Sequence, residues 1–244
     1  HHSYHIGKVH YDISANFNYS MLRYGHLEQA VHNSAYNRWL SDLNGRNENI
    51  TWSYKAAGQF QTQAEINSSP VQDDRQNSTL RPGDIKFADL NGDGVIDGSD
   101  IEPIGYGNNP ELTYGLSINL TWKKFGLTMN WSGAAGFEIN DNLSPSSNMN
   151  WFTLFMDRWH HQVDTDPNSP WVPGKFPSFI GGGSGGNSSL STFWLKSAAY
   201  LRLKSLNLNY TLESRYFKKI GLERVVIAVS GQNLLNLTGL QYIA

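Results

Sequence analysis

Apolar and polar residues alternate with a period of two along five segments of the chain. In residues 8–21 the odd positions from Val9 to Met21 are apolar or aromatic, and the even positions from His10 to Ser20 are polar. The same alternation runs through both halves of 113–134 and through 200–211 and 224–233. A period of two places the apolar side chains on one face of a β-strand. The pattern therefore predicts long strands with one apolar and one polar face.

Two local features refine the predicted strands. Only Lys123 and Lys124 separate the two alternating halves of 113–134, which predicts a tight antiparallel hairpin. Leu201 and Leu203 stand in the opposite phase to Leu206. This slip predicts either a β-bulge between Lys204 and Ser205 or an outer strand end that rises above the membrane, where the facing of side chains no longer matters.

The predicted strands have the length and composition of membrane-crossing strands. Each has about ten residues or more, enough to cross a bilayer at a steep tilt. The polar positions are mostly Asn, Ser, Thr and Gly rather than the Lys and Glu of a solvated sheet. Aromatic residues of the apolar rows stand near strand ends, as an aromatic girdle requires; they are Tyr114, Trp122, Phe125 and Trp131.

The connections alternate between short turns and two long segments, 22–112 and 135–193. Short turns on one side and long loops on the other are typical of outer-membrane barrels. The predicted fold class is therefore all-β, an antiparallel transmembrane β-barrel with long extracellular loops. A soluble β-sandwich, whose strands also alternate, is the alternative.

The hairpin turn orients the predicted strands. If the Lys123-Lys124 turn is periplasmic, the segments 22–112 and 135–193 both lie outside the cell. Five crossings are an odd number, and they cannot close a sheet whose edges would otherwise meet lipid. We therefore expect the chain to be part of a larger barrel.

Composition excludes several classes of function. The chain has 244 residues, 16% of them charged, and a formal net charge of −2, so it is not a basic nucleic-acid binder. It has no cysteine, which excludes disulfides, thiolate metal sites and cysteine nucleophiles. The sequence contains no run of about twenty apolar residues, so it predicts no transmembrane helix. A barrel strand escapes that criterion, because only every second residue is apolar.

Residues 89–100 have the spacing of a twelve-residue calcium loop. Gly94 stands at position 6, where such a loop turns sharply. The predicted ligands of one structural Ca²⁺ are Asp89, Asn91, Asp93, the Val95 carbonyl, Asp97 or its bound water, and Asp100. The last position has Asp instead of the usual Glu, and this shorter side chain predicts a weak or structural site. A turn rich in Asp, Asn and Gly that binds no metal is the alternative.

Several motifs carry a family resemblance. Gly83 to Asp89 leads into the calcium-type loop, and Thr113 to Leu116 follows it. Tyr200 to Leu206 and Val229 to Leu235 come later in the same order. Together with Trp52 to Lys55, these motifs resemble the C-terminal region of SusC/RagA-type TonB-dependent outer-membrane transporters over nearly the whole chain.

The resemblance implies a location in the cell outer membrane and TonB-dependent import of large nutrients, oligosaccharides or peptides. The chain would form the C-terminal part of one barrel domain of about 22 strands. A SusD-like surface lipoprotein is the implied partner. The TonB complex would act through a plug domain and TonB box that this chain lacks, as it lacks the early strands and a closing strand. The resemblance implies no enzymatic activity.

Two clusters in 135–193 are further candidates. Trp151, Phe152, Phe155 and Trp159 have helix-like spacing. They predict either a short amphipathic helix packed on neighbouring loops or an aromatic platform for sugar rings or the lipoprotein partner. Asp157, His160, His161, Asp164 and Asp166 are expected to be solvated loop residues, with a zinc or catalytic cluster as the alternative.

Two other classes of protein remain as rivals. One is a soluble calcium-binding carbohydrate-recognition β-sandwich module, and the other is a surface-exposed hydrolase fragment acting on glycans.

Overall fold

The computed structural model describes residues 1–142, 156–163, 165–178, 186–213 and 220–240. The chain divides into two compact units. Unit 1 comprises His1–Leu22, Gly107–Glu138 and Ser197–Ala244, and unit 2 comprises Arg23–Tyr106 and Ile139–Lys196.

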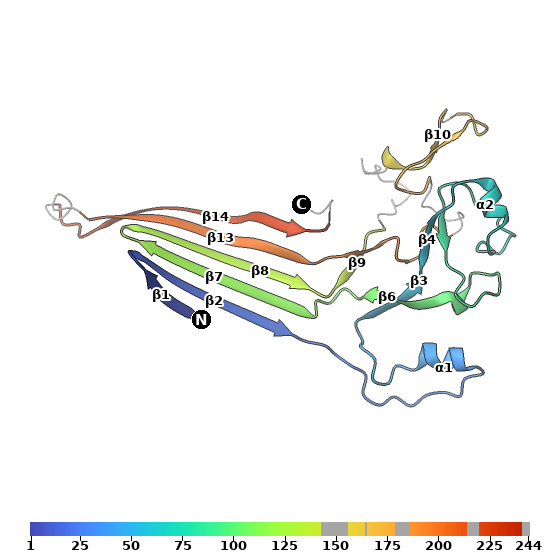
Figure 1. Ribbon diagram of the computed structural model, residues 1–244, viewed down its shortest axis with the longest axis horizontal. Coiled ribbons are helices and arrows are strands. Elements are labelled where there is room, and N and C mark those ends of the chain that lie inside the picture. Colours follow the sequence, from blue (N-terminus) through green and yellow to red (C-terminus); the bar gives the residue numbers. More distant parts are fainter. Residues whose placement is uncertain (143–155, 164, 179–185, 214–219, 241–244) are drawn as a thin grey trace. The chain divides into compact units, whose positions relative to one another are not determined.

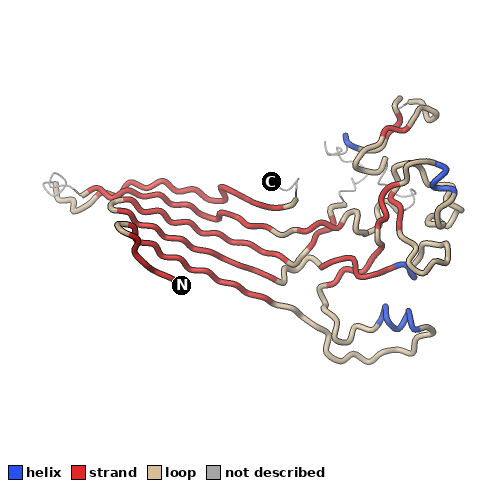
Figure 2. Tube along the Cα trace, viewed as in Figure 1, coloured by secondary structure: helices blue, strands red, loops and turns tan. Residues whose placement is uncertain are grey.

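Unit 1 is built on one six-stranded sheet (Figure 1). Its strands, in spatial order, are β1 (His2–Ile6), β2 (Val9–Tyr19), β7 (Leu112–Trp122), β8 (Phe125–Ala135), β13 (Tyr200–Leu212) and β14 (Val225–Thr238). All neighbours are antiparallel. Figure 2 shows these strands as the long red segments of the chain. Within the described residues the sheet is open, with β1 and β14 at its edges.

The strand bounds can be compared with the predicted ranges. β2 lies within 8–21, and β7 and β8 coincide with 113–134 to within one residue at each end. β14 continues five residues beyond the predicted end at 233. β1 was not predicted, because its alternation of His2, Tyr4 and Ile6 with Ser3 and His5 is too short to stand out.

Two turns and a bulge fix the register. Trp122 pairs with Phe125 across the Lys123-Lys124 turn, where Lys123 has a φ of 55°. Gly7, with a φ of 61°, turns β1 into β2, and glycine takes this left-handed conformation without steric cost. The register of β13 shifts between Leu203 and Ser205 against both neighbours, so the predicted bulge is confirmed.

Unit 2 consists mostly of loops held together by short elements. Its helices are α1 (Ala35–Ser41), α2 (Gln63–Asn67) and the 3-10 turn η1 (Gly98–Asp100). Its strands pair as β3 (Ile50–Tyr54) with β6 (Ile101–Tyr106), β4 (Ala56–Gln59) with β5 (Ile85–Phe87), and β10 (His160–His161) with β11 (Trp171–Val172). β9 (Glu138–Asn140) pairs with β12 (Leu195–Ser197), where the chain passes between the two units.

Two small apolar clusters form the core of unit 2. One contains Ile85, Phe87, Phe176 and Trp194. The other contains Phe60, Ile66 and Leu80. The first cluster joins residues from the two long sequence segments of this unit, so these segments share one core.

The described helices are short, at seven residues for α1 and five for α2. None of the helices in the described ranges is long and apolar enough to cross a membrane.

Candidate functional site

The register of unit 1 gathers apolar side chains on one face of the sheet. Residues that pair across antiparallel strands point to the same side. One row across the sheet is Tyr11, Leu120, Leu127, Leu208 and Val229, and the next is Ile13, Ile118, Met129 and Leu206. A third row, beyond the bulge, is Ala15, Leu116, Trp131, Leu203 and Leu235. The apolar face is therefore continuous from β2 to β14.

Much of this apolar face is exposed. Phe17 is 72% exposed, Val229 69% and Ile227 57%. A sheet that folds in water buries its apolar face under a second layer. The described residues of unit 1 supply only the one sheet. A contiguous exposed apolar surface of this kind marks a contact with protein or with a membrane.

Aromatic rings gather at the hairpin end of the apolar face. The rings of Trp122 and Phe125 are stacked at 6.0 Å, and the ring of Tyr210 lies 4.6 Å from that of Phe125. The Lys123 ammonium lies 4.9 Å from the Trp122 ring centre. Aromatic rings beside a lysine at a strand end are suited to a membrane interface.

The opposite face carries polar side chains in rows of the same register. One row is Asp12, Asn119, Thr128, Asn207 and Ser230. The next is Ser14, Ser117, Asn130, Ser205 and Gln232, and the next is Asn16, Gly115, Ser132, Arg202 and Asn236. These are mostly neutral groups that both donate and accept hydrogen bonds, as a water-filled lumen requires.

One contact ties three strands together on the apolar side. The Tyr114 hydroxyl donates a hydrogen bond to the Tyr200 carbonyl at 2.9 Å. Its ring lies over Gly133 of the intervening strand, where an added Cβ would stand 2.2 Å from the ring and 2.6 Å from the Tyr200 carbonyl oxygen. Gly133 therefore makes room for this ring.

In unit 2, the calcium-type loop 89–100 is held by its own carboxylates. Asp89 accepts the amides of Gly92 at 2.6 Å and Gly94 at 2.9 Å. Asp100 is fully buried and accepts the amides of Leu90 at 2.8 Å and Asp97 at 2.9 Å. The Ile96 amide donates to the Val71 carbonyl at 2.8 Å, which joins the loop to the rest of unit 2.

These donors fit a calcium ligand set in chemistry, because they are all oxygen atoms. Each carboxylate oxygen that accepts an amide keeps a further lone pair. However, Asp100 is turned toward two backbone amides. Within the described residues, no group of three or more His, Cys, Asp or Glu side chains is placed to hold a metal ion. Calcium binding by the loop stays a prediction.

A buried polar pair joins the two sequence segments of unit 2. The Asn187 carboxamide donates to the Asp84 carboxylate at 2.7 Å and accepts the Ile85 amide at 2.8 Å. The Trp194 indole donates to the Asn187 carbonyl at 2.7 Å. Burial raises the pKa of Asp84, and the hydrogen bonds from Asn187 and the Arg81 amide oppose that rise only in part. Burial therefore disfavours the charged form of Asp84, and these partners hold its carboxylate in place.

The pKa of a second carboxylate of unit 2, that of Asp73, shifts in the opposite direction. Burial alone would raise the pKa of Asp73, but hydrogen bonds from Thr79, Arg75 and Asn77 outweigh it and lower the pKa. Asp74, Gln76 and Asn77 all have a positive φ here. Such backbone is strained in residues with a side chain, and the Asp73 carboxylate provides the bonds that hold it.

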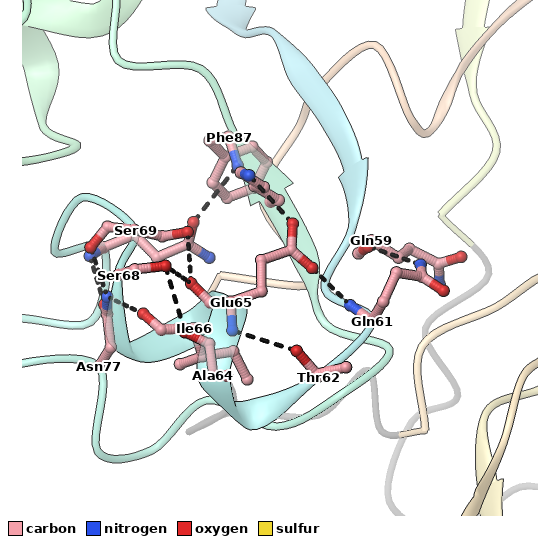
Figure 3. Close-up of polar contacts among 12 residues, drawn as sticks. Gln59, Gln61, Thr62, Ala64, Glu65, Ile66, Ser68, Ser69, Asn77 and Phe87 are labelled. Carbon is pink, nitrogen blue, oxygen red and sulfur yellow. Dashed lines mark hydrogen bonds and ion pairs between the residues drawn. The ribbon is translucent and has the colours of Figure 1, made fainter.

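The α2 segment is fixed by capping bonds (Figure 3). The Thr62 hydroxyl accepts the Glu65 amide at 3.1 Å, and Glu65 accepts the Gln61 amide at 2.8 Å. The Lys86 ammonium donates to the other Glu65 carboxylate oxygen at 3.0 Å. The Gln61 amide, followed by Lys86, lowers the pKa of Glu65. These bonds place the short helix against β5.

The predicted aromatic cluster lies only partly within the described residues. Trp151, Phe152 and Phe155 fall outside them. Trp159 is 3% exposed, and an added Cβ at Gly83 would stand 2.3 Å from its Cγ. In this structure Trp159 is buried against Gly83, so it does not offer an open ring to a sugar or a partner. The alternative of packing on neighbouring loops fits Trp159 better.

The histidines beside it make separate contacts. His160 Nδ1 lies 2.9 Å from the Arg158 carbonyl, and His161 Nδ1 lies 2.8 Å from the Ser169 carbonyl. The His161 ring packs on Trp171 at 3.9 Å. Asp164 falls outside the described residues.

The sequence patterns did not predict the Asp84 and Asn187 pair or the role of Trp194. Asp84 and Asn187 are about one hundred residues apart in the sequence. A single sequence carries no signal for such a pairing. Asp84 stands in the Gly83 to Asp89 motif, which indicates the family resemblance but not a buried pair.

Comparisons with known proteins agree with this arrangement. No family model matches the chain. TonB-dependent receptor P3 of Formosa agariphila is 29% identical over 157 residues, which are 64% of this chain and 15% of that protein. TonB-dependent receptor P26 of the same organism is 24% identical over 184 residues, 74% of this chain and 17% of that protein. The chain thus aligns with only a small part of each curated relative.

A solved structure, that of the RagAB peptide transporter, matches with a TM-score of 0.58 and 18% identity. The match covers 98% of this chain and 24% of the other. The resemblance to TonB-dependent transporters and the location in the outer membrane are confirmed.

Proposed function

We propose that this chain forms part of the wall and outer loops of a TonB-dependent β-barrel transporter that imports large nutrients. The observation that carries the proposal is the two-faced sheet of unit 1. Its continuous apolar face would contact lipid, and its polar face would line the lumen. The open edges at β1 and β14 would pair with further strands of a barrel, because unpaired edges are not tolerated in lipid.

The two long segments of unit 2 would lie outside the cell. The first segment precedes β7 and the second follows β8. The other ends of these two strands meet at the Lys123-Lys124 turn, and short turns are periplasmic in such barrels. A surface lipoprotein of the SusD type is the proposed partner of this side, and the TonB complex would act through a plug domain. Trp39, which is 45% exposed, offers an aromatic contact among the described residues of unit 2.

The soluble β-sandwich alternative requires a second sheet over the apolar face. The described part of unit 1 provides none, so the transporter is favoured. The relatives carry the names of receptors and a transporter, which favours transport over catalysis.

An uptake experiment tests the proposal. A strain that lacks the gene for the full-length protein would be given a fluorescent mixture of oligosaccharides and peptides of several kilodaltons. We expect at least one probe to enter the periplasm of the parent strain and to stay outside the mutant. Entry should also stop when the proton-motive force is dissipated. Equal entry of every probe into both strains would refute the transport role.

The partner is tested by purification in mild detergent. A tag on the full-length protein should bring down a surface lipoprotein in a stable ratio. If the tagged protein is repeatedly recovered alone, the partner proposal fails, although the transport proposal does not.

A further inference from the structure

A hollow of about 590 Å³ lies on the polar face of unit 1, across β2, β7, β8 and β13. Asn16, Asn130, Ser132 and Lys204 line it. Gly115 lies among them, and a Cβ there would stand 2.3 Å from the Asn16 side-chain oxygen. The missing side chain at Gly115 therefore gives the hollow its depth, and Asn16 leans across it.

Most groups in the hollow are neutral and can both donate and accept hydrogen bonds. Asn16, Asn130 and Ser132 are typical of them. Residues of the apolar rows also border the hollow, such as Leu116 and Trp131, but their side chains belong to the opposite face. Sugar hydroxyls match the neutral hydrogen-bonding groups of such a surface.

The charges around the hollow are positive. Lys204 lines it, because the bulge places this extra residue beside the polar rows. Arg202 points to the same face, with its guanidinium 5.4 Å from the Tyr200 ring centre. No ion pair joins Lys204 or Arg202 to a carboxylate of the described residues.

Acidic residues are nearly absent from the surrounding strands. Among β2, β7, β8, β13 and β14 only Asp12 is acidic. It stands four residues before Asn16, about 13 Å along the strand, and it pairs with the His1 ring at 3.3 Å. Glu111, just before β7, is buried and is not part of the lining. The hollow thus combines neutral hydrogen-bonding groups with an uncompensated positive charge.

We infer that this hollow binds acidic oligosaccharides, those that carry carboxylate or sulfate groups. Lys204 and Arg202 provide the charge recognition, and the Asn and Ser side chains bind the sugar hydroxyls. The inference rests on the proposed function, since it takes the polar face as the lumen through which the nutrient passes. It makes Lys204 and Arg202 specificity-determining residues of the barrel wall.

The test uses the full-length protein, purified in detergent with any lipoprotein that accompanies it. The wild type, the double variant R202Q/K204Q and the control K124Q are applied to an array of neutral, uronate-containing and sulfated oligosaccharides and of acidic and neutral peptides. Lys124 lies in the hairpin turn and does not line the hollow, so K124Q removes one positive charge, against two in the double variant, without changing the lining. The strongest ligand is then titrated at low and high salt.

We expect the wild type and K124Q to bind acidic oligosaccharides most strongly and to lose affinity as salt rises. R202Q/K204Q should bind them roughly ten-fold more weakly, the size expected for a charged hydrogen bond. It should keep its affinity for neutral oligosaccharides. A preference for neutral oligosaccharides or for peptides would overturn the inference, as would equal binding of acidic ligands by the wild type and the double variant.

These outcomes separate the two proposals. Failure of the charge preference, with some oligosaccharide or peptide still bound, removes only the acidic subsite. If the wild type binds nothing on the array and the uptake experiment also shows no entry, the transport role itself fails.

Discussion

The hydroxyl of Tyr114 donates a hydrogen bond to the carbonyl of Tyr200, two strands away, at 2.9 Å. Its ring crosses the intervening strand over Gly133. A bond that spans three strands resists sliding of any one of them, so this contact helps to fix the register at the end of the sheet far from the Lys123-Lys124 turn.

Gly133→Ala should disrupt this contact. The new methyl group would stand 2.2 Å from the Tyr114 ring and 2.6 Å from a backbone oxygen, so either the ring or the backbone must move. We expect a loss of about 1–3 kcal/mol of folding free energy, measured by urea titration of the full-length protein refolded into lipid vesicles.

Gly126→Ala on the same strand is the matched control. The three heavy atoms nearest to its methyl group all belong to the end of the Asn209 side chain, which can rotate away. Equal losses for the two variants would show that the ring contact at Gly133 has no special role.

If the apolar face contacts lipid, as proposed, neighbouring positions should respond differently to a charge. Ile118 pairs with Ile13 and Met129 on the apolar face, whereas Asn119 pairs with Asp12 and Thr128 on the polar face. Ile118→Arg should cost about 2–4 kcal/mol if it lies near the membrane midplane. Asn119→Arg should cost much less, since this position lies on the polar face, which would line the lumen. The same folding assay measures both, and similar costs would argue against a membrane-spanning sheet.

Much of the sheet can be derived from the sequence, because a period of two survives in every long strand. The bulge at Lys204 was visible as a change of phase. The effect of the bulge on function was not visible in the sequence. Only the structure shows that Lys204 lines the hollow and that Arg202 pairs with Ser132, which also lines it. Unit 2 was less predictable. Its core depends on pairings such as Asp84 with Asn187, which no local periodicity encodes. The spacing of Trp159 and its aromatic neighbours predicted a helix. The burial of Trp159 depends instead on Gly83, a residue far away in the sequence.

The two shifted carboxylates of unit 2 predict opposite responses to pH. The pKa of Asp84 is raised, so its contribution to stability is complete below the unfolded pKa of about 3.9 and is lost as pH rises through the higher folded value. The pKa of Asp73 is lowered, so its contribution is present above the unfolded pKa and is lost as pH falls through the lower folded value.

Hydrogen exchange of the full-length protein, corrected for the intrinsic pH dependence, measures these responses. Protection of the Ile85 amide should decrease from pH 4 to pH 8, and protection of the Thr79 amide should decrease below pH 4. Asp84→Asn should remove the first trend and leave the second. Parallel trends at the two amides would contradict the assigned shifts.

The calcium prediction concerns the loop 89–100. If the loop binds Ca²⁺, millimolar calcium should slow hydrogen exchange between Asp84 and Gly105 relative to a chelator, because the cation offsets four crowded carboxylates. Asp93→Ala should abolish the difference while the sheet of unit 1 stays folded. Ser99→Ala, which keeps every predicted ligand, is the control. Exchange that does not respond to calcium in the wild type would leave the loop as a hydrogen-bonded turn.

The shared core of unit 2 has a consequence for engineering. Ile85 and Phe87 come from one long segment, and Trp194 and the Asn187 carboxamide that binds the Ile85 amide come from the other. A single loop grafted from a relative would bring half of an interface and leave its buried indole or carboxylate without the matching surface. A chimera that takes its binding properties from a relative should therefore fold only when 23–106 and 139–196 are both replaced. The two segments form one structural unit although they are separate in the sequence.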